Sequence, residues 1–80
     1  MADNEIYKTL SAVMQKVFKD PALTAKPEMS ARDVKNWDSL NHIRFVIEVE
    51  RAFGIKFATS EVSKFKNVGD LATLIEQKRP

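Results

Sequence analysis

The sequence contains no cysteine and a single histidine, His42. Without cysteine the chain has no disulfide, no thiolate metal site and no cysteine nucleophile of its own. One histidine cannot form the histidine cluster that binds zinc. The composition therefore argues against redox enzymes and metalloenzymes.

Long hydrophobic runs are also missing, because no uninterrupted apolar stretch exceeds three residues, as at Phe45–Ile47. A helix that spans a bilayer needs about 20. The N-terminus carries Asp3 and Glu5, whereas a secretory signal would be basic and then apolar. We therefore expect a cytoplasmic protein without membrane insertion. Its 80 residues, 44% of them hydrophobic, allow one small domain over residues 1–80.

Neither sign of charge dominates the chain. Thirteen Lys and Arg residues oppose eleven Asp and Glu residues, for a net charge of +2. Residues 1–40 carry six charges of each sign, so the small basic excess lies in residues 41–80. A nucleic-acid-binding face needs a basic stripe or patch, and the only dense basic cluster is Lys64 with Lys66. We therefore expect no nucleic-acid partner.

The first part of the chain has apolar residues at spacings of three and four, which is the pattern of an amphipathic helix. They are Ile6, Leu10, Val13, Met14, Val17 and Phe18. Asp3 or Asn4 can cap the start of this helix, and we expect Pro21 to stop it.

A second helix is predicted from Asp38, its N-terminal cap, to Phe53, with Gly54 in the left-handed position after its end. Residues 19–37, which precede it, contain two prolines and no sustained period, and they are too many for an ordinary connection. The Ser30–Asp33 spacing indicates a short capped turn in this loop. The apolar residues expected to anchor the loop are Leu23, Met29, Val34 and Trp37.

Two further helical segments follow. Thr59 or Ser60 is expected to cap a short third helix that presents Val62 and Phe65. Asn67 and Asp70 have capping-box spacing before a last helix that fades at Lys78. The apolar face of that helix consists of Val68, Leu71, Ala72, Leu74 and Ile75. No strand alternation is present. The predicted fold class is therefore all-α, a small antiparallel four-helix bundle with a long first loop and a short third helix.

On a helical wheel the second helix has two apolar sides. The residues expected to be buried are Phe45, Val46, Val49, Ala52 and Phe53, with His42 on the same side as a hydrogen-bonded structural residue. The other side mixes charged and aliphatic residues, namely Leu40, Asn41, Arg44, Ile47, Glu48 and Arg51, with Ile43 at its border. Two interpretations remain open: this side binds partners, or its aliphatic residues pack under the long first loop.

Ser39 places a hydroxyl at the N-terminus of the second helix. Unpaired N–H groups and the positive end of the helix dipole favour a phosphate at such a position. The simpler alternative is that Asp38 and Ser39 only cap the helix, as Asp-Ser commonly does. A hydrolase in which His42 activates Ser39 is disfavoured, because no Gly-x-Ser-x-Gly elbow surrounds Ser39 and no second histidine is present.

The Asp38-Ser39-Leu40 motif follows an amphipathic helix and a long proline-containing loop, and it opens a helix of about four turns. In this arrangement the chain resembles the acyl carrier proteins over its whole length. The resemblance implies a carrier and not an enzyme. In this family a phosphopantetheinyl transferase esterifies the serine, here Ser39, with 4′-phosphopantetheine from coenzyme A. The thiol of this arm then carries acyl groups as thioesters.

The resemblance also gives roles to neighbouring residues. Asp38 matches the aspartate that helps to hold the metal and phosphate in the transferase complex. The leucine and the second helix form the surface that acyl-loading and acyl-processing enzymes recognise, which assigns Leu40 and Ile47 as contacts. Arg44, Glu48 and Arg51 would then select the partner by charge. Such a carrier is expected to be a monomer. An inter-helix cavity for the tethered chain and a filled core are equally compatible with Phe45, Val49, Phe57, Val62, Phe65 and Val68.

One feature departs from the pattern of fatty-acid synthesis. Its carriers are usually acidic along the second helix, whereas this chain has Arg44 and Arg51 there. We therefore expect a specialised pathway that makes a polyketide, a modified acyl unit or a lipid. A peptidyl or aminoacyl carrier is an alternative, although that family usually has glycines where this chain has Asn36-Trp37-Asp38. The other alternative is a helical protein or nucleic-acid interaction module without a prosthetic group.

Overall fold

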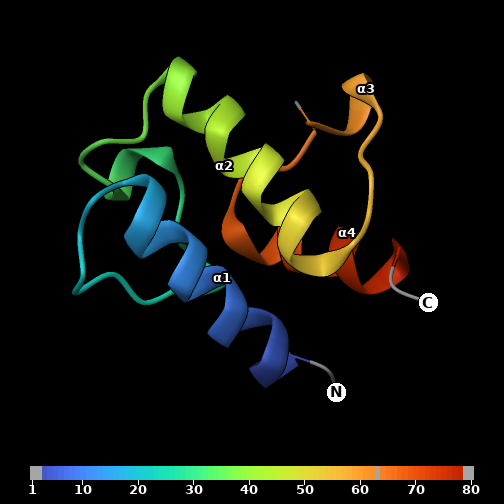
Figure 1. The fold of residues 1–80 in the computed structure, drawn as a ribbon, viewed down its shortest axis with the longest axis horizontal. Coiled ribbons are helices and arrows are strands. Elements are labelled where there is room, and N and C mark those ends of the chain that lie inside the picture. The colour runs from blue at the N-terminus through green and yellow to red at the C-terminus, as the bar shows by residue number, and fades with distance from the viewer. Residues whose placement is uncertain (1–2, 63, 79–80) are drawn as a thin grey trace.

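A computed structural model describes residues 3–62 and 64–78 (Figure 1). Its helices are α1 (Asp3–Val17), α2 (Ser39–Phe53), α3 (Thr59–Val62) and α4 (Val68–Lys78), with a 3₁₀ turn at Ala31–Asp33, and these described residues include no strand. This confirms the predicted all-α class, the long first loop and the short third helix. None of the described helices is long and apolar enough to cross a membrane.

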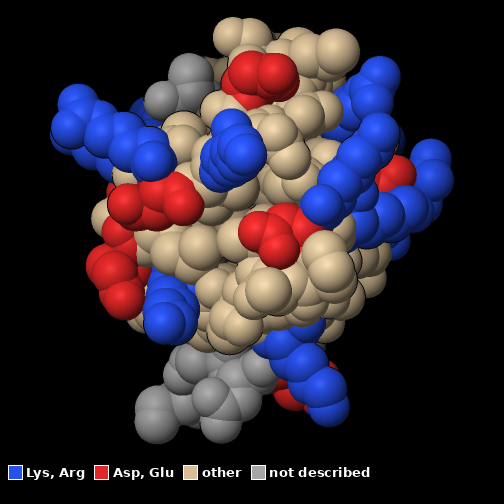
Figure 2. Space-filling model, turned by 90° about the vertical axis from the view of Figure 1, so that its left-hand side faces the viewer, with Lys and Arg blue, Asp and Glu red and all other residues tan. Residues whose placement is uncertain are grey.

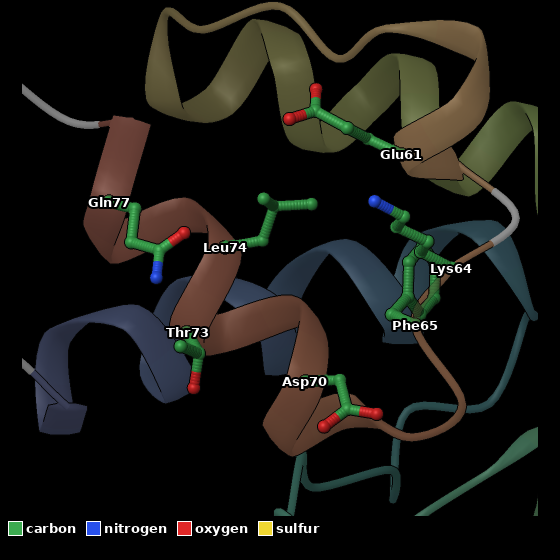
Figure 3. A pocket seen from close by; sticks show the side chains of 7 residues that line it. All are labelled: Glu61, Lys64, Phe65, Asp70, Thr73, Leu74 and Gln77. Carbon is green, nitrogen blue, oxygen red and sulfur yellow. The ribbon is translucent and has the colours of Figure 1, made fainter.

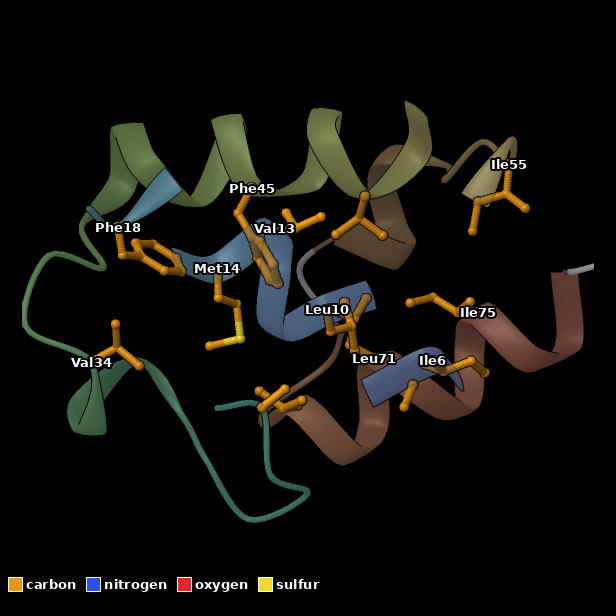
Figure 4. Close-up of a cluster of buried hydrophobic side chains, with 14 residues drawn as sticks. Ile6, Leu10, Val13, Met14, Phe18, Val34, Phe45, Ile55, Leu71 and Ile75 are labelled. Atoms are coloured by element: carbon orange, nitrogen blue, oxygen red, sulfur yellow. The ribbon is translucent and has the colours of Figure 1, made fainter. Parts of the chain in front are cut away.

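The hydrophobic core forms where α1 packs against both α2 and α4. Figure 4 shows Phe18 and Val34 at the end of this cluster near the first loop, and Ile55 toward the opposite end, near Ile75. The predicted apolar stripe of α1 is confirmed, except that Val17 is only half-buried. Ala25, which the sequence patterns did not identify, is also in the core.

The predicted buried side of α2 is right for its middle and wrong for its end. Phe45 and Val49 are completely buried and Val46 nearly so, but Ala52 is exposed and Phe53 is half-buried. The reason is that the chain turns after Gly54 and inserts Ile55 into the core. The core therefore continues past the end of α2 through Ile55.

Both ends of α2 follow the sequence signals. Asp38 has extended backbone angles and its side chain accepts the Asn41 N–H, while Gly54 has φ 67°. The Ile55 N–H then donates to the Glu50 carbonyl over 3.1 Å, which closes the helix with a Schellman motif.

The ends of α1 differ from the prediction. The helix already includes Asp3 and Asn4, whose side chains lie outside the described part of the structure. It ends at Val17, before Pro21 is reached. Lys19 adopts the left-handed conformation with φ 54°, and the Asp20 N–H donates to the Gln15 carbonyl over 3.1 Å. A Schellman motif built on lysine, and not the proline, therefore terminates α1.

Residues 19–37 are attached to two helices. On α1, Ser11 Oγ accepts the Ala25 N–H over 2.8 Å. At the start of α4, the carbonyls of Pro27 and Met29 accept the N–H groups of Gly69 and Val68 over 2.9 and 2.8 Å. The predicted anchors are confirmed, because Val34 is buried and Leu23, Met29 and Trp37 pack half-buried against the core. The capped turn is also present, since Asp33 Oδ2 accepts the Ser30 N–H over 3.0 Å.

The starts of α3 and α4 differ slightly from the sequence prediction. Ala58, and not Thr59 or Ser60, precedes α3, and its N–H donates to Glu61 Oε1 over 2.8 Å. Asn67 caps α4 as predicted by accepting the Asp70 N–H over 2.8 Å. The Asp70 carboxylate, however, accepts the Lys66 N–H and does not return to Asn67. Only half of the predicted capping box therefore forms.

Candidate functional site

Ser39 is exposed and is the first residue of α2. The preceding Asp38 caps the helix through one oxygen, because Oδ1 accepts the Asn41 N–H over 2.9 Å. This leaves the Ser39 hydroxyl beside the positive end of the helix dipole, where the first N–H groups of a helix have no intrahelical acceptor. The arrangement suits attachment of a phosphate ester to Ser39.

Two asparagines fix the path of the chain into Ser39. The Asn36 side chain donates to the Phe18 carbonyl over 2.7 Å, and Asn41 Nδ2 donates to the Asn36 carbonyl over 2.8 Å. Asn41 is half-buried, so this member of the expected partner side also holds the loop to α2. Helical periodicity gave no sign of this structural role, because both acceptors are backbone carbonyls brought close by the fold.

Trp37 and His42 form a hydrogen-bonded aromatic pair next to Ser39. Trp37 Nε1 donates to His42 Nδ1 over 3.0 Å, and His42 Nε2 lies 3.4 Å from the Val62 carbonyl. This confirms His42 as a hydrogen-bonded structural residue. Because the indole N–H is only a donor, Nδ1 is the acceptor and the neutral ring carries its proton on Nε2. Both nitrogens of His42 are thus directed away from activating the Ser39 hydroxyl.

An open hollow of about 470 Å³ lies directly beside the serine. It is lined by Ala31, Trp37, Asp38, Ser39 and His42. The 3₁₀ turn, the end of the first loop and the first turn of α2 therefore meet around the hydroxyl. The described residues include no group of three or more His, Cys, Asp or Glu side chains arranged to hold a metal ion.

The aliphatic residues on the outer side of α2 are exposed. Leu40, Ile43 and Ile47 are 59%, 55% and 47% exposed. The interpretation that they pack under the first loop is therefore wrong, and the alternative, that they form part of a surface for partners, is retained.

The charges along this side are partly paired. Glu48 lies 3.5 Å from Lys16 Nζ and 3.8 Å from Arg51 Nη1. A shallow groove of about 260 Å³ runs between the end of α1 and α2 and is lined by Lys16, Val17, Lys19, Arg44, Ile47 and Glu48. The two lysines were not predicted, because only the packing of α1 on α2 brings them to this side. Figure 2 shows acidic side chains scattered among the basic ones over one face of the molecule.

For three of the six residues that were compatible with either a cargo cavity or a filled core, the structure shows a filled core. Phe45, Val49 and Val68 are completely buried in the core, so none of them lines an open cavity. A groove of about 320 Å³ does lie between α3 and α4, lined by Glu61, Lys64, Phe65, Asp70, Thr73, Leu74 and Gln77 (Figure 3). Of the six residues that were equally compatible with a cavity and with a filled core, this groove includes only Phe65.

A hydrogen bond and an ion pair of Glu61 hold α3 in place beside this groove. Glu61 accepts the Ala58 N–H and lies 2.9 Å from Lys78 Nζ on α4. The Ala58 hydrogen bond, followed by the contact with Lys78, lowers the pKa of the Glu61 carboxyl. The ionised carboxylate therefore ties α3 to the C-terminal end of α4.

Comparisons with known proteins agree with this arrangement. Residues 8–75 match the protein family described as phosphopantetheine attachment site. The chain is 27% identical over 78 residues to the acyl carrier protein of Thermosynechococcus vestitus, which covers 98% of this chain and 96% of that protein. It is 28% identical over 72 residues to the acyl carrier protein of Rickettsia typhi, covering 90% and 83% of the two chains.

A solved structure is also similar. It is the solution NMR structure of the holo acyl carrier protein from Geobacter metallireducens, which is 38% identical in sequence. The TM-score is 0.85, and the match covers 98% of this chain and 86% of the other.

Proposed function

Because this chain belongs to the acyl carrier proteins, within the phosphopantetheine attachment-site family, we propose that Ser39 is the residue to which its cofactor is attached. The chain is a carrier and not an enzyme, and its cofactor is covalently bound 4′-phosphopantetheine. Its general partners are a phosphopantetheinyl transferase and acyl-processing enzymes. When bound, the arm supplies the thiol that holds acyl groups as thioesters, which a chain without cysteine lacks.

The observation that carries the Ser39 assignment is its exposed hydroxyl at the capped start of α2. Attachment forms a phosphate ester between Ser39 Oγ and the pantetheine phosphate of coenzyme A, while the pyrophosphate bond of coenzyme A breaks, 3′,5′-ADP leaves and the hydroxyl proton is released. The helix terminus favours the negative charge placed there. Asp38 uses Oδ1 for the cap, so Oδ2 remains for the second role proposed for it, which is to help hold the metal and phosphate of the transferase complex.

A loading assay tests this assignment. Incubation with coenzyme A, magnesium and a broad-specificity phosphopantetheinyl transferase should add one arm, measured by intact mass and located at Ser39 by peptide mapping. Ser39→Ala should add none and remain folded. Thr73→Ala removes an exposed hydroxyl on α4, which bonds only to its own helix at the Gly69 carbonyl, and should load normally. An unmodified wild-type mass, under conditions that convert a control carrier, would favour an interaction module without a prosthetic group.

The partner surface is the outer side of α2, with Leu40, Asn41, Arg44, Ile47, Glu48 and Arg51. Its support is the exposure of two aliphatic side chains, Leu40 and Ile47, between charged ones. Lys16 and Lys19 extend this surface onto the end of α1. A partner enzyme that fits it presents carboxylates around an apolar side chain, because opposite charges complement each other across interfaces.

This basic surface supports a dedicated pathway that builds a polyketide, a modified acyl unit or a lipid, in preference to housekeeping fatty-acid synthesis. A peptidyl or aminoacyl carrier is the competing function. To distinguish an acyl carrier from a peptidyl or aminoacyl carrier, the arm is loaded with acyl groups and with aminoacyl groups. The enzymes that accept each loaded form are then compared. We place the carrier in the cytoplasm, as a monomer whose residues 1–80 form one unit without a nucleic-acid partner.

A further inference from the structure

We propose that Asn36 and Asn41 are positioning residues for the loading of Ser39, because they hold its hydroxyl at a fixed place relative to the end of α1. This inference rests on the attachment at Ser39 proposed above. Both asparagines act through the backbone that leads into the serine, and not on the reacting atoms. The inference adds a second requirement for loading, which is that the exposed serine must also be held in place.

A continuous line of hydrogen bonds runs from the end of α1 to the start of α2. The Asn36 side chain donates to the Phe18 carbonyl, just beyond the end of α1, over 2.7 Å. The Asn36 carbonyl in turn accepts the Asn41 side chain over 2.8 Å, and Asn41 belongs to the first turn of α2. The two asparagines therefore join two helices that residues 19–37 separate in the sequence. Because both acceptors are main-chain carbonyls, the line fixes the backbone itself.

The backbone between the two asparagines forms a tight turn just before Ser39. The Asn36 carbonyl also accepts the Asp38 N–H over 3.1 Å, which closes a three-residue turn. Asp38 Oδ1 accepts the Asn41 N–H over 2.9 Å. Asn41 therefore holds both ends of the turn, Asn36 through its side chain and Asp38 through its backbone. A turn held at both ends leaves Ser39 few alternative positions.

The position of Ser39 relative to α1 matters because the proposed partner surface lies on two helices. Lys16 and Lys19 lie at the end of α1, whereas Arg44 and Ile47 belong to α2. An enzyme bound to this surface finds the hydroxyl in the same place each time only if the start of α2 is fixed relative to both helices. A misplacement of about 1 Å can slow a reaction by about 10²-fold when it disturbs the productive geometry.

The alternative is that the asparagines only stabilise the fold, and Asn67 offers the matched comparison. Asn67 is half-buried like Asn41 and also lies at the start of a helix, where its side chain accepts the Asp70 N–H over 2.8 Å. It holds α4, however, and not the segment that leads into Ser39. A purely structural role would make the two asparagines equivalent for loading, whereas a positioning role makes them different.

Steady-state loading with coenzyme A, magnesium and a broad-specificity phosphopantetheinyl transferase tests this difference. Asn41→Ala should lower kcat by about tenfold or more and change KM for the carrier by less than about twofold, because the charged and aliphatic side chains of the partner surface are unchanged. Alanine favours a helix more than asparagine does, so α2 should remain folded by circular dichroism. Asn41→Gln keeps an amide donor and should restore part of kcat.

Asn67→Ala is the control. It should melt at a lower temperature than the wild type, since it loses a helix cap, but load with the kcat of the wild type. A wild-type kcat for Asn41→Ala, or an equal loss of kcat in Asn67→Ala, would overturn the positioning role and leave the attachment intact. A wild-type chain that stays unloaded by intact mass would instead overturn the attachment at Ser39.

A double variant tests whether the two asparagines act together. Asn36→Ala removes the bond to the Phe18 carbonyl but keeps the main-chain carbonyl that accepts from Asn41. If the two act as one line, Asn36→Ala combined with Asn41→Ala should have about the kcat of the more impaired single variant. Losses that multiply would show two independent contributions and overturn the shared line.

Discussion

Both sides of α2 carry large apolar residues, but these lie in opposite environments. Phe45 and Val49 on the inner side are completely buried, whereas Leu40, Ile43 and Ile47 on the outer side are about half-exposed. The inner residues stabilise the fold through burial. The outer ones lie among charges and contribute little to it. An apolar residue on α2 can therefore either stabilise the core or remain available to a partner protein, and its burial shows which of the two applies.

The largest expected effect is on the inner side. Phe45→Ala should lower the free energy of unfolding by about 3–5 kcal/mol, because it leaves a cavity in the core. Native proteins have a total stability of about 5–15 kcal/mol, so this loss is a large fraction of it and the melting temperature should fall strongly. Ile43→Ala is the outer control and should change stability by less than about 0.5 kcal/mol. Equal losses in urea unfolding would remove the distinction between the sides.

Phe53 lies at the border between the two sides and gives an intermediate case. Full burial of such a side chain contributes roughly 1.5–3 kcal/mol, and Phe53 is only half-buried against the core. Phe53→Ala should therefore cost about 1–2 kcal/mol, measured by the same urea unfolding. The helical wheel alone would predict the larger loss typical of a buried phenylalanine. A loss as large as that of Phe45→Ala would place the border of the core beyond the last turn of α2.

The smallest effect on stability is expected for the outer charges. Replacing both Arg44 and Arg51 by glutamate should lower the free energy of unfolding by less than about 1 kcal/mol. The change removes the Glu48–Arg51 ion pair and places like charges on both sides of Glu48, but water and salt screen exposed charges. Acylation by the pathway's own enzyme should slow by about tenfold at low salt, and less at moderate salt. Enzymes that act on acidic carriers should accept the variant better than the wild type.

The control for this experiment is Lys56→Glu, which reverses an exposed charge after the end of α2, outside the groove. Its acylation rates should equal those of the wild type. If the variant with both arginines replaced also has wild-type acylation rates, the partner surface lies elsewhere. The long first loop is then the next region to mutate.

Local sequence signals predicted most of the helices and their ends well. Aspartate is strongly preferred as an N-terminal cap, and glycine is strongly preferred in the left-handed position after a helix. Asp38 and Gly54 therefore marked both ends of α2 correctly. Ser39 was proposed as the attachment residue because the Asp38-Ser39-Leu40 motif resembles that of the acyl carrier proteins, and its exposed place at the start of α2 supports this proposal. The end of α1 was missed because lysine rarely adopts the left-handed conformation that Lys19 has, so its residue type gives no signal.

Features that depend on tertiary packing were not predictable. The burial of Ala25 follows from its hydrogen bond to Ser11, far along the chain, and the basic groove needs α1 beside α2. The filled core at Phe45 and Val49 depends on how neighbouring side chains share volume. Periodicity gives the direction of a side chain, but not whether it meets a packed neighbour or an open cavity.

The attachment of the first loop to α4 means that two segments far apart in the sequence complete each other. Helices begin with N–H groups that have no acceptor of their own, and here the carbonyls of Pro27 and Met29 serve the first amides of α4. The approach is close, since a side chain at Gly69 would meet the Pro27 carbonyl oxygen at 3.0 Å. Cleavage of the loop near Pro27 would therefore endanger the acceptors of the first two amides of α4, while Asn67 would still accept the Asp70 N–H. This long connection is thus as much a part of the framework as the helices it joins.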